Sequence, residues 1–269
     1  MVVQHNLRAM NSNRMLNITA NEQAKSSEKL SSGYRINRAA DDAAGLSISE
    51  TMRRQIRGLN QASANAEDGI SFVQTVEGAY TEVTEMLQRM NELAVQAANG
   101  TSNATQDGYI NDEITQLKAE INRIGSATQF NGTAAFGTEM TFQIGETNNT
   151  VNQLTVTTEA MATTTAAVQN LTITDDASAR TAIDSVKTAL EAVAAQRSLL
   201  GAVQNRLDHT IKNLDNVAEN VTASESRIRD TDMSTEMVKY SNNNILAQAG
   251  QAMLAQSNQA NQGVLSLLQ

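Results

Sequence analysis

An apolar residue recurs at every seventh position over a long stretch of the first half of the chain. One row is Met52, Leu59, Ala66, Val73, Tyr80, Leu87 and Ala94, and a second is Ala62, Val76, Val83, Met90 and Ala97, broken only by Gly69. Two rows with this spacing form one apolar seam along an α-helix. The pattern predicts a single long helix over residues 43–98, which the glycines inside it do not interrupt.

The second half of the chain carries a matching seam. Its main row is Val186, Val193, Leu200, Leu207, Leu214 and Val221, and its companion row is Ile183, Leu190, Ile211 and Ala218, with Arg197 and Gln204 as polar interruptions. We expect a second long helix that opens at Asp175–Asp176 and reaches Arg229. An apolar stripe gains free energy only when it is covered, so the two long helices are expected to pair.

Shorter helices are predicted around this pair. A weakly amphipathic helix in residues 1–30 should end at Gly33, which suits a left-handed C-terminal position. Asp41 and Asp42 are placed to cap the first long helix. Ile110, Ile114, Leu117, Ile121 and Ile124 alternate four and three apart, which predicts a third helix over 105–128 that folds back on the first long one.

The pattern changes between the two halves of the chain. Met140, Phe142 and Ile144 alternate with polar residues, 145–149 reads as a turn, and Leu154 and Val156 supply a return strand. Val151 is out of phase, which suggests a bulge. We expect a β-hairpin at about 138–158 and a further short strand at Leu171 and Ile173.

These elements predict a mainly α fold, a long antiparallel helical bundle or coiled coil with a small β-hairpin insert. Three segments are expected: 1–42, the bundle at 43–230, and 231–269. The two outer segments are weakly patterned and rich in Asn, Gln and Ala, and they should lie together.

Composition agrees with this picture. Proline is absent, which permits very long helices, and aromatic residues make up only 3% of the chain, which suits narrow helix seams. The net charge of −9 argues against general binding of nucleic acid. No segment is long and apolar enough to span a membrane, and the first residues lack the apolar region of a secretory signal peptide.

The sequence offers no catalytic or metal-binding pattern. Cysteine is absent, and the two histidines, His5 and His209, have no ligand spacing around them. No nucleophile elbow and no phosphate-binding loop is present. We therefore expect a non-enzymatic protein without cofactors, whose function is association through its helices.

Several segments resemble the signatures of bacterial flagellins. In the first half these are LSSGYRINRAADDAAGLSIS (30–49), QASANAEDGISFVQTVEGA (61–79), LQRMNELAVQAANG (87–100), EITQLKAEINRI (113–124) and TQFNGT (128–133). In the second half they are LGAVQNRLDHTIKNL (200–214), SRIRDTDMSTEM (226–237) and ILAQAGQAMLAQSNQANQGVLSLLQ (245–269).

The resemblance implies a short flagellin in which the outer segments form the D0 domain and the bundle forms D1. Such a protein is a secreted structural subunit that polymerises with itself into the helical filament of the bacterial flagellum, for motility. Its implied partners are a flagellin chaperone, the flagellar type III export apparatus and the filament cap.

The resemblance also implies an immune ligand that binds Toll-like receptor 5 through D1. Arg89, Leu93 and Glu113 match the central receptor-binding positions of the family, and Gln88, Glu92 and Gln96 match nearby ones. The sequence departs from the familiar enterobacterial pattern at Asn91 and Leu117, where arginine is common. The C-terminal cluster Val264, Leu265, Leu267 and Leu268 is the implied contact for the chaperone or for a NAIP-type cytosolic sensor.

Two other interpretations remain open. A hook–filament junction protein shares the bundle plan, although poorer matches are expected at LGAVQNR and the terminal VLSLL. A helical-bundle adaptor should instead show heptads of even strength and a defined tip.

Overall fold

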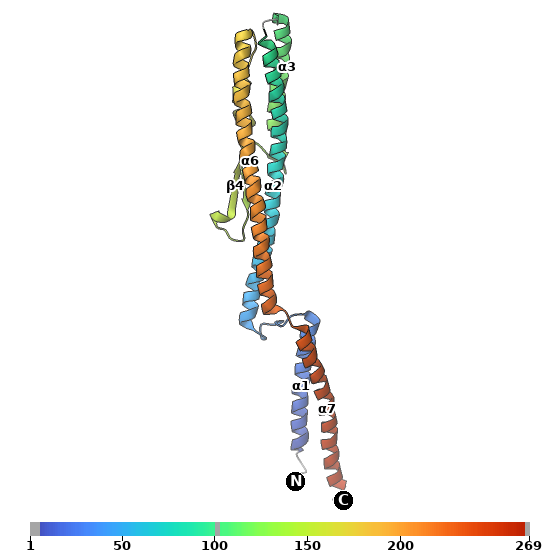
Figure 1. Cartoon of the computed structure of the whole chain (residues 1–269). Helices are drawn as coiled ribbons and strands as arrows, with labels where there is room; N and C mark the ends of the chain where they lie inside the picture. The colour runs from blue at the N-terminus through green and yellow to red at the C-terminus, as the bar shows by residue number, and fades with distance from the viewer. Residues whose placement is uncertain (1–5, 100–102, 267–269) are drawn as a thin grey trace. The chain divides into compact units, whose positions relative to one another are not determined.

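The computed structural model of the chain describes residues 6–99 and 103–266, and for residues 104 and 261–266 it describes the backbone alone. Five long helices dominate it: α1 (Leu7–Ser32), α2 (Ala43–Ala97), α3 (Ala104–Ala127), α6 (Asp176–Arg229) and α7 (Met233–Ser266). Between α3 and α6 lie two small antiparallel hairpins and two short helices (Figure 1). The predicted fold class, mainly α with a hairpin insert, is confirmed.

The described chain divides into two compact units. The first unit comprises residues 1–54 and 220–269, and the second comprises residues 55–219. Both divisions fall inside the long helices α2 and α6, whereas the segment boundaries expected from the sequence, at 42/43 and 230/231, follow helix ends. Those expected domain boundaries stay a prediction.

The core of the second unit is the predicted seam. Val73, Tyr80, Leu87 and Ala94 of α2 are buried with Val186, Val193 and Leu200 of α6 in one cluster. Ser63 of α2 donates to Asp215 of α6 at 3.3 Å, and Arg197 of α6 pairs with Glu77 of α2 at 3.5 Å. Because the α6 residue numbers fall as the α2 numbers rise, the two helices run antiparallel.

Gly69, the break in the second apolar row, faces α6 and the larger hairpin. A Cβ built at this position would be 3.2 Å from Leu207 Cδ1 and 3.4 Å from the Phe142 ring. The glycine therefore leaves room for a leucine of α6 and for an aromatic ring of the hairpin.

The third helix packs on the second unit's core as predicted. Ile110, Ile114 and Ile121 are buried in the same cluster as the α2 and α6 seams. Asn103 caps the helix through its side chain, and Gln106 returns a bond to the Asn103 backbone. This capping box fixes where α3 begins after the preceding turn.

The larger hairpin is close to its predicted position. Strands β3 (Glu139–Gln143) and β4 (Gln153–Thr157) pair antiparallel, with Thr141 opposite Thr155. Val151 does not form a bulge in the return strand. It lies in the 3₁₀ turn η1 (Thr150–Asn152), which Asn149 caps before β4 begins. Its side chain is largely exposed.

The strand predicted at Leu171 and Ile173 is wrong. Both residues are buried, but the backbone there bonds to side chains of α3 and not to another strand. Lys118 Nζ donates to the Leu171 carbonyl at 2.8 Å, and Ile173 N donates to Asn111 Oδ1 at 3.3 Å. The preceding Thr-rich stretch forms the short helices α4 (Met161–Thr164) and α5 (Ala166–Gln169).

A second hairpin, unpredicted, joins β1 (Gln129–Phe130) to β2 (Thr133–Ala134). Asn131 and Gly132 both adopt positive φ, at 49° and 77°. A two-residue hairpin turn of this kind requires positive φ at both central positions, which Asn-Gly adopts readily.

In the first unit, the loop after α1 is tied to the loop after α6. Gly33 ends α1 in the predicted left-handed conformation, with φ of 75°. Thr231 N donates to the Gly33 carbonyl at 2.9 Å, and Arg35 N donates to the Arg229 carbonyl at 2.7 Å. The Arg229 guanidinium lies 4.8 Å from the centre of the Tyr34 ring.

Of the two residues predicted to cap α2, only Asp42 does so. Asp42 Oδ1 accepts from Gly45 N at 2.9 Å and caps the helix. Asp41 instead accepts from the backbone N–H groups of Asn37 and Arg38, and these bonds lower the pKa of its carboxyl.

Candidate assembly surface

Helices α1 and α7 of the first unit lie side by side and meet through small and polar residues (Figure 1). On each helix, one set of partly or fully buried positions recurs at alternating spacings of three and four. On α1 these are Ala9, Ser12, Leu16, Thr19, Gln23, Ser26 and Leu30, and on α7 they are Glu236, Tyr240, Asn243, Ala247, Gly250, Leu254 and Ser257. This is the spacing of a coiled-coil seam, but most of its positions hold small or polar side chains.

A buried polar pair lies at one end of this seam. Ser26 Oγ donates to Glu236 Oε1 at 2.6 Å, and the two residues are 5% and 6% exposed. The bond from Ser26, helped by the charges of Lys239 and Lys29, lowers the pKa of the Glu236 carboxyl. Among the described side chains of α1 and α7, these two alone are classed as buried.

The small residues let the two helix backbones approach. A Cβ added to Gly250 of α7 would be 3.3 Å from Leu16 Cδ1 of α1. Near the far end of the seam, Asn6 Nδ2 donates to the Ser257 carbonyl at 3.3 Å. The pair is therefore aligned along its length, from Ser26 to Asn6.

Most of the large apolar side chains of α1 and α7 point outward, and Leu16, Leu30 and Leu254 of the seam are exceptions. At least half of the surface of each of the following is exposed: Leu7, Met10, Met15 and Ile18 on α1, and Met237, Val238, Ile245, Leu246 and Met253 on α7. The pair is thus inverted relative to an ordinary two-helix unit, because most residues between the helices are small or polar and most of the large apolar residues lie outside. Many exposed large apolar side chains on one helix pair favour a site of association.

A charged cluster lies on the second unit, where α2 meets α3. Arg89 Nε donates to Glu113 Oε1 of α3 at 2.9 Å, and Arg89 Nη1 donates to Glu92 Oε2 at 3.0 Å. These bonds raise the pKa of Arg89, which stays charged at any physiological pH. All three side chains are substantially exposed, so the cluster is available to a partner.

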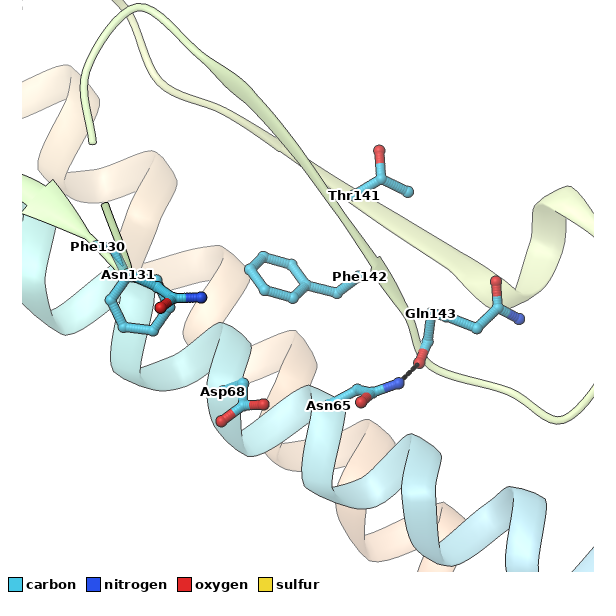
Figure 2. Close-up of a pocket in the computed structure, with 7 residues that line it drawn as sticks. All are labelled: Asn65, Asp68, Phe130, Asn131, Thr141, Phe142 and Gln143. Atoms are coloured by element: carbon cyan, nitrogen blue, oxygen red, sulfur yellow. Dashed lines mark hydrogen bonds between the residues drawn. The ribbon is translucent and has the colours of Figure 1, made fainter. Parts of the chain in front are cut away.

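A hollow of about 490 Å³ lies between α2 and the two hairpins (Figure 2). Asn65 and Asp68 line it from α2, Phe130 and Asn131 from β1 and its turn, and Thr141, Phe142 and Gln143 from β3. Asn65 Nδ2 donates to the Gln143 carbonyl at 3.0 Å and anchors β3 to the helix. We call this hollow the hairpin groove.

Metal-binding clusters are absent from the part of the chain that the structure describes. None of the helices in residues 6–99 and 103–266 is both long enough and apolar enough to cross a membrane.

Comparison with known families agrees with this description. Residues 3–141 match the bacterial flagellin N-terminal helical region, and residues 183–268 match the bacterial flagellin C-terminal helical region. The chain belongs to the bacterial flagellin family.

Relatives match this flagellin along its whole length. A flagellin of Halalkalibacterium halodurans is 52% identical over 271 residues, covering 100% of both chains. Flagellin FlaB2 of Treponema pallidum is 48% identical over 286 residues, and a flagellin of Bacillus subtilis is 46% identical over 305 residues, again covering 100% of both chains. The crystal structure of Bacillus cereus flagellin aligns with a TM-score of 0.51 and 31% identity, over 56% of this chain and 88% of that one.

The flagellin structure separates the residues expected to bind a receptor into two groups. Gln88, Arg89, Glu92 and Gln96 of α2 and Glu113 of α3 are exposed. Leu93 is 2% exposed and packs in the core of the second unit. Its expected contact with a receptor stays a prediction, and it requires an indirect effect through the position of α2.

The side chains of the C-terminal cluster lie outside the described part of the chain. Val264 and Leu265 belong to helix α7, but their side chains are outside the described residues, as are Leu267 and Leu268 altogether. Their expected contact with a chaperone or a cytosolic sensor therefore stays a prediction.

Sequence reasoning missed the α1–α7 seam and the hairpin groove. The seam has coiled-coil spacing, but its residues are polar or small, and a search for apolar periodicity does not register them. The groove depends on the β1–β2 turn, for which Asn131-Gly132 was a usable signal.

Proposed function

We propose that this flagellin is a non-enzymatic structural subunit of the bacterial flagellar filament. The inverted α1–α7 pair supports this most directly. Exposed side chains such as Met15, Ile18, Ile245 and Leu246 leave apolar area in water that burial would stabilise by about 25 cal/mol per Å². Neighbouring copies of the chain, packed around the same axis, would cover these faces.

Point variants of the outward face test the proposal. Replacing Ile245 and Leu246 by Gln should leave the helix content unchanged and raise the concentration needed for filament growth by at least tenfold. The matched control replaces Val151, an even more exposed apolar residue of the second unit, by Gln. Filament growth is followed by electron microscopy and sedimentation. Normal growth of the Ile245/Leu246 variant would contradict the proposal.

The family suggests further partners for the same chain. We propose that the protein is secreted through the flagellar type III apparatus, that a chaperone binds the segment around Val264–Leu268 beforehand, and that subunits are added beneath a filament cap. Deleting residues 264–268 should abolish co-purification with the chaperone while unit 2 melts normally.

A second proposal concerns recognition of flagellin by Toll-like receptor 5. The exposed Arg89 cluster supports it, because an arginine held by Glu113 and Glu92 presents a preorganised fork of donors to a partner. Arg89→Ala should weaken receptor binding more than tenfold, or about 1.4 kcal/mol. The matched control is Arg123→Ala, since Arg123 forms a similarly exposed pair with Glu120 on α3. Equal affinities for both variants would refute the assignment.

A further inference from the structure

The hairpin groove lies within a part of the chain that has no cationic side chain. Residues 58–88 and 124–179 contain no Lys, Arg or His. They contain ten carboxylates: Glu67, Asp68, Glu77, Glu82, Glu85, Glu139, Glu146, Glu159, Asp175 and Asp176. Arg197 of α6 pairs with Glu77, but Asp68, which lines the groove, forms no ion pair within the described residues. The groove therefore favours an occupant with positive charge.

The groove itself combines the groups that bind a guanidinium. Asp68 lines the hollow from α2, and Figure 2 shows it below the Phe142 ring, with Asn131 to the left of that ring. Neither Asp68 nor Asn131 has a side-chain hydrogen bond within residues 6–99 and 103–266. A carboxylate offers two parallel acceptors to arginine, and a half-buried aromatic ring offers a face on which the planar cation stacks.

The chain holds a matching group on the same helix. Immediately before the cation-free stretch, α2 carries Arg53, Arg54 and Arg57 within five positions. Arg53 pairs with Glu50 and Glu225, and Arg54 also has a partner. Arg57 is exposed and forms no ion pair within the described residues.

Arg57 cannot reach the groove of its own chain. Eleven residues separate it from Asp68 on a continuous helix, which is roughly 16 Å at a rise of 1.5 Å per residue. We propose that Arg57 of a second copy of this chain occupies the hairpin groove and pairs with Asp68. Because the contact joins two different surfaces, it can repeat from copy to copy, and in a filament it would set a fixed stagger between neighbours.

This inference rests on the proposed filament function and names one contact within it. It assigns to the β1–β2 turn and to β3 the role of walls for an incoming arginine. It also gives Asn65 a positioning role, because its bond to the Gln143 carbonyl holds β3 against α2 and keeps the groove open.

Cross-linking tests the contact directly, because the natural chain has no cysteine. Variants D68C and R57C are mixed, assembled into filaments and treated with a short bismaleimide spacer. The expected product is a covalent dimer of one D68C chain and one R57C chain, identified by mass spectrometry of the linked peptides. Filaments that form normally without this mixed dimer, or with D68C homodimers in equal amount, would overturn the inference while the filament function stands. Failure of the unsubstituted chain to form filaments would instead remove the proposed function.

A charge-matched pair of variants gives a second measurement. D68N should raise the critical concentration for filament growth about tenfold, because it removes the charge that pairs with the incoming arginine. E67Q removes the same charge at the adjacent position, which is exposed but does not line the groove. Equal shifts for the two variants would show that only the overall charge matters, and would refute a specific pair at Asp68.

Discussion

The Ser26–Glu236 pair gives a quantitative prediction about how the terminal helices are held together. Ser26→Ala removes the 2.6 Å hydrogen bond but leaves the Glu236 carboxylate buried between α1 and α7. The remaining partner, Lys239, is 3.5 Å away and mostly exposed, so it offsets little of the loss. Loss of a bond to a buried charged group costs about 1.5–3 kcal/mol, which corresponds to at least a roughly tenfold larger open population of the pair.

Native-state hydrogen exchange of the monomer measures this opening. Backbone amides of α1 and α7 should exchange about tenfold faster in Ser26→Ala, whereas amides of the second unit should be unaffected. Ser27→Ala is the control, because Ser27 is exposed and the substitution brings the same gain in helix propensity. Identical exchange in the two variants would show that the polar pair does not hold the helices.

The same pair should make the terminal helices sensitive to acid. The pKa of Glu236 is lowered below its ordinary value of 4.5, chiefly by the bond from Ser26. A lowered pKa contributes stability above the ordinary value, and this stability is lost as the pH falls through the lowered value. Protection factors of the α1 and α7 amides, which correct for the slower intrinsic exchange in acid, should therefore fall below about pH 4.5 in the natural chain, and those of Ser26→Ala should respond less.

Two further predictions concern the second unit. Gly78→Ala should stabilise it by about 0.5–1 kcal/mol, because a Cβ there meets nothing within 4 Å. Gly125→Ala should destabilise it, because its Cβ would lie 2.5 Å from Met161 Cβ. Urea denaturation of both variants checks that the two changes in stability have opposite signs. Asp175→Ala should cost about 1 kcal/mol, because Asp175 Oδ1 accepts from Ser178 N and caps α6; a thermal midpoint unchanged from that of the natural chain would contradict this role.

The sequence was informative where burial and helix period coincide. Rows such as Val73–Tyr80–Leu87 predicted α2 because the residues that form its seam are large and apolar. The same reasoning failed at Leu171 and Ile173. These two apolar residues alternate with polar ones because their side chains are buried, but the backbone there does not pair with another strand. Only the positions of Lys118 and Asn111 in three dimensions reveal that α3 side chains satisfy this backbone.

The candidate surfaces were predicted unevenly for the same reason. Arg89 and Glu113 could be selected through family resemblance, but the burial of Leu93 could be read only weakly, from its position beside the seam residue Ala94. The α1–α7 seam could not be found by hydrophobicity, because Ser26 and Glu236 are polar residues in core positions. Their pairing joins residues 210 positions apart, which no local pattern encodes.

The inverted α1–α7 pair also has a calorimetric consequence. The heat capacity change of unfolding follows the apolar area removed from water, and the polar seam between α1 and α7 removes little. Melting of the monomer should therefore draw its heat capacity change mainly from the second unit. Polymerisation, which covers the outward methionines, leucines and isoleucines, should carry a large negative heat capacity change of its own. Filament growth would then weaken on cooling, as expected for a process driven by the hydrophobic effect.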